Sequence, residues 1–133
     1  MDAPCYCIVL RKASRRITAL YDEALAPIGV NLAQFSLLRK IARKEPVSLT
    51  ELGRLADLDR STIGRNVRVL DRMGLTETRP GREDQREAMV ALTAAGRKAL
   101  EKGAPLWDSV QTRIEQRLGA ENARQLETLL NAL

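Results

Sequence analysis

The sequence DRSTIGRNVRVLDRM, residues 59–73, decides the fold class of this chain. Its apolar residues recur every three to four positions, as on one face of a helix: Ile63, Val67, Leu70 and Met73. Asp59 is a favourable N-cap for this helix, and Gly74 supplies its end. We therefore expect an amphipathic helix whose apolar face packs against the rest of the domain.

The opposite face of this helix carries polar side chains: Ser61, Thr62, Arg65, Asn66 and Arg68. Arginine can bridge O6 and N7 of guanine, asparagine can pair with adenine, and hydroxyl groups contact bases or phosphates. Gly64 leaves room for another molecule to approach closely. These residue types favour a surface that reads DNA, and an ordinary solvated helix face is the alternative.

A second helix precedes this one after a short turn. Ser48-Leu-Thr-Glu51 fits a capping box, in which the serine hydroxyl and the glutamate carboxylate bind exposed amides at a helix start. That helix runs to Ala56, and residues 57–59 form the turn. Two helices joined by a turn of about three residues are typical of proteins that place the second helix in the major groove.

Residues 75–92 follow as a hairpin with a charged tip. Two short strands, 75–79 and 88–92, flank PGREDQR at residues 80–86. Arg82 and Arg86 at this tip are suited to contact sugar-phosphate beside the groove, and one of them to enter the minor groove. The alternative is a polar hairpin tip with no partner.

Amphipathic helices flank the helix pair and the hairpin. We expect them over residues 4–26 and 31–44, and from Thr93 to Gly119 with a kink at Gly103 and Pro105. A final short helix follows, with Ala123, Leu126, Leu130 and Leu133 on one face. The fold is then mainly α with a small β-wing, in a single domain. Its parts are a helical dimerisation region at 1–30 and 100–133, and a winged helix-turn-helix at 31–93 with its wing at about 75–92. The apolar stripes of the dimerisation region exceed what the winged part can cover, so we expect them to pair across a dimer axis and partly to form intrachain core.

Charge and composition limit the function. The chain has 22 basic and 17 acidic residues, a formal net charge of +5, and no histidine. Residues 47–92 carry eight basic and eight acidic side chains, so DNA binding must depend on the placement of individual arginines. Without histidine, a phosphate loop or a cluster of metal ligands, we expect neither an enzyme nor a bound metal or cofactor.

The chain also lacks the pattern of a membrane or secreted protein. No window approaches the ~20 apolar residues that a membrane span needs. The first helix carries charges where a signal peptide needs an apolar core: Arg11, Lys12, Arg15 and Arg16. Cys5 and Cys7 are too few and too close together for a disulfide framework. We expect a cytoplasmic protein with no membrane partner.

Four motifs occur together with consistent spacing: Ser48-Leu-Thr-Glu-Leu, Leu58-Asp-Arg-Ser-Thr, Leu70-Asp-Arg-Met-Gly-Leu75, and Asp84-x-Arg86 followed by Leu92-Thr93-x-x-Gly96. With them the chain resembles the MarR family, the multiple-antibiotic-resistance type of regulators. The resemblance covers nearly the whole chain. It implies a two-fold homodimer that binds double-stranded DNA at a near-palindromic operator. It also implies that Asp84 positions the wing and that Arg86 contacts DNA.

The resemblance further implies an input that releases DNA. One form of input is a small molecule bound between the dimerisation and winged parts, which would make the protein an effector-released repressor. The candidate lining residues are Ile17, Tyr21, Phe35, Leu38 and Trp107. Aromatic and leucine side chains at helical spacing are equally typical of a core, and the effector stays unidentified.

A second form of input is oxidation. Cys7 precedes Gly29 by 22 residues, which is similar to the reactive cysteine of the organic-hydroperoxide-sensing branch, and Tyr21 matches a tyrosine of that branch. Leu32 and Arg11 stand where that branch has further polar or tyrosine side chains. Arg11 lies one helical turn from Cys7 and would favour a thiolate. Two inert cysteines are the alternative for this site, and a winged-helix protein-interaction module is the alternative for the chain as a whole.

Overall fold

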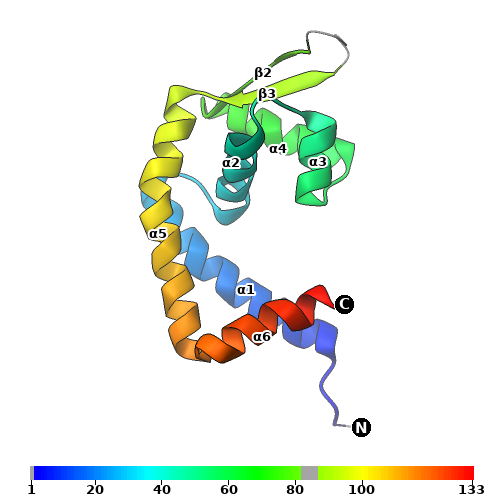
Figure 1. The fold of residues 1–133 in the computed structure, drawn as a ribbon, viewed down its shortest axis with the longest axis vertical. Helices are drawn as coiled ribbons and strands as arrows, with labels where there is room; N and C mark the ends of the chain where they lie inside the picture. The colour runs from blue at the N-terminus through cyan, green and yellow to red at the C-terminus, as the bar shows by residue number, and fades with distance from the viewer. Residues whose placement is uncertain (1, 82–86) are drawn as a thin grey trace.

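The computed structural model describes residues 2–81 and 87–133, and it is mainly helical with one small sheet, as the sequence predicts (Figure 1). The elements follow in this order: α1 (Tyr6–Leu25), η1 (Ala26–Ile28), α2 (Leu32–Lys44), β1 (Val47–Ser48), α3 (Leu49–Ala56), α4 (Arg60–Arg72), β2 (Thr76–Pro80), β3 (Ala88–Leu92), α5 (Ala94–Leu118) and α6 (Ala120–Asn131).

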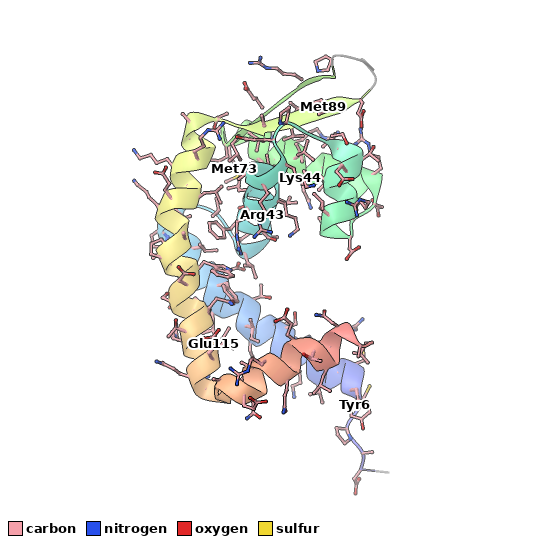
Figure 2. The ribbon with its side chains drawn as sticks, viewed as in Figure 1. Tyr6, Arg43, Lys44, Met73, Met89 and Glu115 are labelled. Atoms are coloured by element: carbon pink, nitrogen blue, oxygen red, sulfur yellow. The ribbon has the colours of Figure 1, made fainter. Side chains whose placement is uncertain are left out.

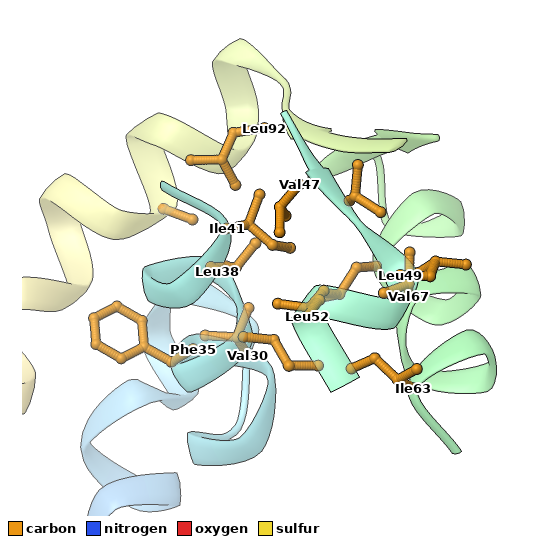
Figure 3. Packing of buried hydrophobic residues seen from close by; sticks show 14 of the residues in the cluster. Val30, Phe35, Leu38, Ile41, Val47, Leu49, Leu52, Ile63, Val67 and Leu92 are labelled. Carbon is orange, nitrogen blue, oxygen red and sulfur yellow. The ribbon is translucent and has the colours of Figure 1, made fainter. Parts of the chain in front are cut away.

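The core lies between α2, α3, α4 and the sheet (Figure 3). Its large side chains include eight that are at most 2 % exposed: Phe35, Leu38, Ile41, Leu52, Ile63, Val67, Leu70 and Val90. Each buried side chain of this size contributes about 1.5–3 kcal/mol of hydrophobic free energy. The core therefore fixes α4 by its apolar face and leaves the other face toward solvent.

The sheet has three antiparallel strands in the order β1-β3-β2. The predicted hairpin of β2 and β3 is present, and β1 joins it as a third strand that was not predicted. Val47 in β1 pairs with Val90 in β3, and both side chains are buried. A strand of two residues leaves no alternating pattern in the sequence, which is why it was not expected. β1 ties the start of α3 to the hairpin.

Side-chain caps begin the two helices of the helix pair. Ser48 Oγ accepts from the amide of Glu51 at 3.0 Å, and Asp59 Oδ1 accepts from the amide of Thr62 at 2.8 Å. The expected capping box at Ser48 is only half present, because the Glu51 carboxylate binds the guanidinium of Arg54 instead. Both predicted starts are otherwise confirmed.

The first helix is shorter than expected from the pattern at 4–26. α1 begins at Tyr6 with Cys5 as its N-cap, and it gives way to the 3-10 helix η1 at Ala26. Pro27 lies in the first turn of η1, where a missing amide hydrogen costs no hydrogen bond. Tyr21 and Leu25 are the residues of α1 that are buried within the chain.

The long helix α5 continues through Gly103 and Pro105 for 25 residues. A Cβ at Gly103 would lie 2.4 Å from Cε2 of Phe35, so only glycine fits at this contact. Gly103 is thus a packing position between α5 and the core of the winged part. Figure 1 shows α5 leading from the sheet to the opposite end of the molecule, where α6 and the start of α1 lie.

That end of the molecule exposes an apolar surface, which we call the α1–α6 face. Its large side chains are between 38 % and 81 % exposed: Tyr6, Ile8, Val9, Leu10, Leu126, Leu129 and Leu130. Many exposed large apolar side chains at one end of a chain are typical of an interface with another protein chain. In the described ranges, no helix has both the length and the apolar character needed to cross a membrane.

Candidate nucleic-acid interface

Helix α4 presents a polar face opposite its buried face. Ser61, Arg65 and Arg68 are exposed, as the sequence predicts, while Thr62 and Asn66 are half-buried at the edge. This difference arises because Asn66 lies one helical turn from both Ile63 and Leu70, so its side chain borders the buried face. The five side chains still occupy the accessible side of one helix.

Met73 is a correction to the predicted apolar face. It is 38 % exposed and serves as the C-cap of α4 (Figure 2). Its backbone is still helical, with φ −74° and ψ −7°, but its side chain lies outside the buried stripe of Ile63, Val67 and Leu70. Gly74 ends the segment with a φ of 76°, as expected for a helix stop.

The first turn of α4 is held by hydrogen bonds between its own side chains. Ser61 Oγ donates to Asp59 Oδ1 at 2.9 Å, and Arg65 Nη2 donates to Thr62 Oγ1 at 3.3 Å. Hydrogen bonds from Thr62 and Ser61 hold the pKa of Asp59 below its usual range. The hydroxyls proposed to meet DNA are thus already oriented, and the amide groups at this helix start favour a nearby phosphate.

Further exposed basic residues on the winged part were missed in the sequence, among them Arg72, Arg43 and Lys44. Arg72 lies seven residues after Arg65, two turns along the same face of α4, and is exposed. Arg43 and Lys44 end α2 and are exposed as well (Figure 2). The spacing of seven residues would have identified Arg72, whereas basic residues in a last turn are common at any helix end.

Helix α4 and the hairpin are joined by one carboxylate. Asp71 Oδ1 accepts from the Thr76 hydroxyl at 2.5 Å, and Asp71 Oδ2 accepts from the Thr78 hydroxyl at 2.8 Å. Thr76 is buried and Thr78 lies two residues further along β2. Since both oxygens of Asp71 bind the same strand, they fix β2 against the end of α4.

The hairpin itself is described on both strands. In β2, Arg79 is exposed and forms an ion pair with Glu77 at 3.1 Å. The predicted DNA contacts Arg82 and Arg86 and the predicted positioning residue Asp84 lie outside the described residues. The described part of the hairpin has a regular register, with Pro80 in β2 opposite Ala88 in β3.

A second carboxylate joins three elements of the winged part. Glu45 follows α2, accepts a hydrogen bond from the amide of Leu92 at 2.8 Å, and pairs with Arg97 near the start of α5. Burial of Glu45 opposes its ionisation, but the Leu92 amide and the Arg97 guanidinium outweigh this effect and lower its pKa. These residues are 47 and 52 positions apart in sequence, so no local pattern could reveal them.

Aromatic and charged side chains meet where α1, α2 and α5 come together. The guanidinium carbon of Arg39 lies 4.3 Å from the centre of the Trp107 ring, and the Tyr21 and Trp107 rings are 6.4 Å apart. The Tyr21 hydroxyl donates to Gln111. Burial raises the pKa of the Tyr21 phenol, with Arg39 acting in the opposite direction. Arg39 was missed because helical spacing does not show which helix faces which.

The five residues predicted to line an effector pocket do not lie in one place. Phe35 and Leu38 belong to the hydrophobic core and are at most 2 % exposed. Ile17 and Tyr21 instead line a cavity of about 390 Å³ between α1, α5 and α6, together with Glu115 and Leu118. Trp107 lies beside Tyr21 at the edge of the core.

Cys5 and Cys7 lie at the amino-terminal end of α1. Both thiols are free and both residues are exposed. Arg11 is exposed one turn further along α1 from Cys7, as the predicted spacing requires.

Comparisons with known proteins were made against this geometry. Residues 30–96, half of the chain, match the family model described as a winged helix DNA-binding domain. The chain is 24 % identical over 127 residues to the organic hydroperoxide resistance transcriptional regulator of Bacillus subtilis, covering 96 % of this chain and 85 % of that protein.

Two solved structures have the same fold and contain DNA. Transcriptional regulator MosR of Mycobacterium tuberculosis, in complex with DNA, is 35 % identical with a TM-score of 0.84, over 97 % of this chain and 96 % of that one. A MarR variant of Escherichia coli, complexed with operator DNA, is 25 % identical with a TM-score of 0.88, over 93 % and 89 % of the two chains.

Proposed function

Because the chain belongs to the MarR family of winged-helix, DNA-binding transcription regulators, we propose that it is a homodimeric repressor that a small molecule releases from a near-palindromic operator. The polar face of α4 carries this proposal. It combines Ser61, Arg65 and Arg68 in exposed positions with an apolar face that the core holds in place. In MosR and MarR the same fold is bound to DNA.

In this proposal α4 enters the major groove and the hairpin grips the backbone beside it. Arg65 and Asn66 read base edges, while Arg68 and the hydroxyls of Ser61 and Thr62 contact bases or phosphates. Arg82 and Arg86 supply the contacts of the hairpin, with Asp84 as their positioning residue. Since residues 47–92 have no net charge, these side chains and not the bulk charge provide the affinity.

The α1–α6 face supports the dimer. A second copy that covered this face would remove seven large, exposed apolar side chains from water. The dimerisation region is then 1–30 with 100–133, and the winged part 31–93. Two copies of α4 would lie about one DNA turn, ~34 Å, apart.

The effector site that the geometry favours lies beside Tyr21 and Trp107. There a half-buried guanidinium, that of Arg39, covers an aromatic ring, and the cavity that Ile17 and Tyr21 line is adjacent. A ligand that displaced Arg39 or separated α1 from α5 would change the angle between the two parts. The second candidate input is oxidation of Cys7, which is supported by its exposure and by the similarity to the hydroperoxide regulator of Bacillus subtilis.

Selection from a pool of random duplexes tests the proposed function. The full-length protein should enrich a site with two half-sites related by a two-fold axis. It should bind that duplex roughly 1,000-fold or more tightly than a scrambled one. The logarithm of the binding constant should fall steeply with the logarithm of salt concentration. Equal, salt-insensitive or undetectable binding to both duplexes would contradict the proposal and favour a protein-interaction module.

A further inference from the structure

Six glycines of the described residues are required by the chain's own structure. Three of them have a positive φ, which other residues disfavour: Gly29, Gly74 and Gly119. The other three lie against the backbone or a ring, where a Cβ would come within 3.0 Å of another atom: Gly53, Gly96 and Gly103. Each of these glycines therefore has an intramolecular explanation.

Gly64 has no such explanation. It lies inside α4, where the backbone conformation suits any residue, and where glycine is less favourable than alanine. A Cβ at Gly64 would have one neighbour within 4 Å, the Nη1 atom of Arg60 at 3.3 Å. This atom is the free end of a flexible, exposed side chain that can move aside. The folded chain thus accepts a methyl group here.

Arg60, Gly64 and Arg68 follow one another at four-residue intervals and so lie along one side of α4. Both arginines are exposed, and Gly64 separates them without a side chain. This side lies between the buried face of Ile63 and Val67 and the outer face of Arg65. A helix in the major groove presents such a flank to the sugar-phosphate strand that borders the groove.

We propose that Gly64 is present for the DNA and not for the fold: it lets a sugar-phosphate strand approach the backbone of α4 between Arg60 and Arg68. Arg60, which covers Gly64 in the absence of DNA, moves onto a phosphate and becomes a further DNA contact. This inference rests on the proposed function, and it identifies a position that sets how deeply α4 enters the groove.

Gly64→Ala separates the two roles of this position. If DNA requires the glycine, the variant should unfold at the same temperature as the wild type or a few degrees higher, because alanine favours the helix. Its affinity for the selected operator duplex of about 30 base pairs should fall at least about tenfold. A lower unfolding temperature, or unchanged operator affinity, would overturn the proposal.

Arg60→Ala tests the phosphate contact. The slope of log binding constant against log salt should decrease by about one relative to the wild type. Lys98→Ala, which removes the same charge from an exposed position of α5 outside both the winged part and the dimerisation region, is the matched control and should leave the slope unchanged. Equal slopes for Arg60→Ala and the wild type would remove Arg60 from the interface.

The wild-type protein in the same assay keeps the two proposals apart. If it prefers the selected duplex over a scrambled one while Gly64→Ala binds equally well, only the inference about Gly64 fails. If the wild type shows no preference, the proposed function fails, and the inference fails with it.

Discussion

Asp71 accepts a hydrogen bond of 2.5 Å from the buried hydroxyl of Thr76, and this bond joins the last turn of α4 to the first strand of the hairpin. The other oxygen of Asp71 binds Thr78 in the same strand. The two parts proposed to contact DNA are therefore held together by one side chain that contacts neither base nor phosphate in our proposal.

Asp71→Ala should lower the free energy of unfolding by about 1–3 kcal/mol, because the buried Thr76 hydroxyl loses its acceptor. Chemical denaturation measures this change. Combining the substitution with Thr76→Val, which removes the hydroxyl and nearly keeps its shape, should recover part of the loss. If the double variant instead loses as much stability, relative to wild type, as the two single variants together, the two side chains do not interact.

Glu45 should make stability depend on pH. Its pKa is lower in the folded chain than the ordinary 4.5, so its contribution is complete above that value and is lost as the pH falls through the folded-state pKa. Glu45→Gln should destabilise the protein near neutral pH, and the difference from wild type should shrink in acid. A constant difference across that range, in denaturant titrations at each pH, would contradict this role.

Arg65→Ala should weaken binding to the selected operator by roughly 10- to 100-fold, the usual effect of removing a side chain that bridges two atoms of one base. Arg86→Ala should weaken it through the hairpin. Both proteins should still form dimers, as measured by sedimentation. If neither substitution changes operator affinity, the reading surface is not the one proposed.

Leu129→Glu should produce a monomer. Leu129 is 66 % exposed in the isolated chain, and a charge buried in an interface without a partner costs several kcal/mol. Lys98→Glu, at an exposed position of α5 outside the proposed dimerisation region, is the control and should remain dimeric. Sedimentation equilibrium reports both results. A dimeric Leu129→Glu variant would exclude this part of α6 from the interface.

Cys7→Ser distinguishes the two proposed inputs. If Cys7 is a sensor, an organic hydroperoxide should release operator DNA from the wild type and not from Cys7→Ser, since oxidation begins at a thiolate. Cys5→Ser serves as the matched control. Release that persists in Cys7→Ser would exclude the thiol at this position as the sensor.

The structural features that depend on local periodicity could be predicted from the sequence. The buried face of α4, except for Met73, and the caps at Ser48 and Asp59 follow from spacing within a few residues, and the structure confirms them. Features that join distant segments were missed, such as the bonds of Glu45 to Leu92 and Arg97. Helical spacing indicates that a residue faces inward but not which residues it contacts. For this reason Phe35 was predicted to line a pocket, although it lies in the core.

The contact between Gly103 and Phe35 bears on the range of operators that a dimer can bind. From Gly103 to its end, α5 continues for 15 residues, about 22 Å at the usual helical rise. A rotation of about 5° at this contact would move the far end of α5 by about 2 Å, on the order of half the spacing of one base pair. In the proposed dimer, the close contact that Gly103 makes with Phe35 would therefore help to set the distance between the two copies of α4.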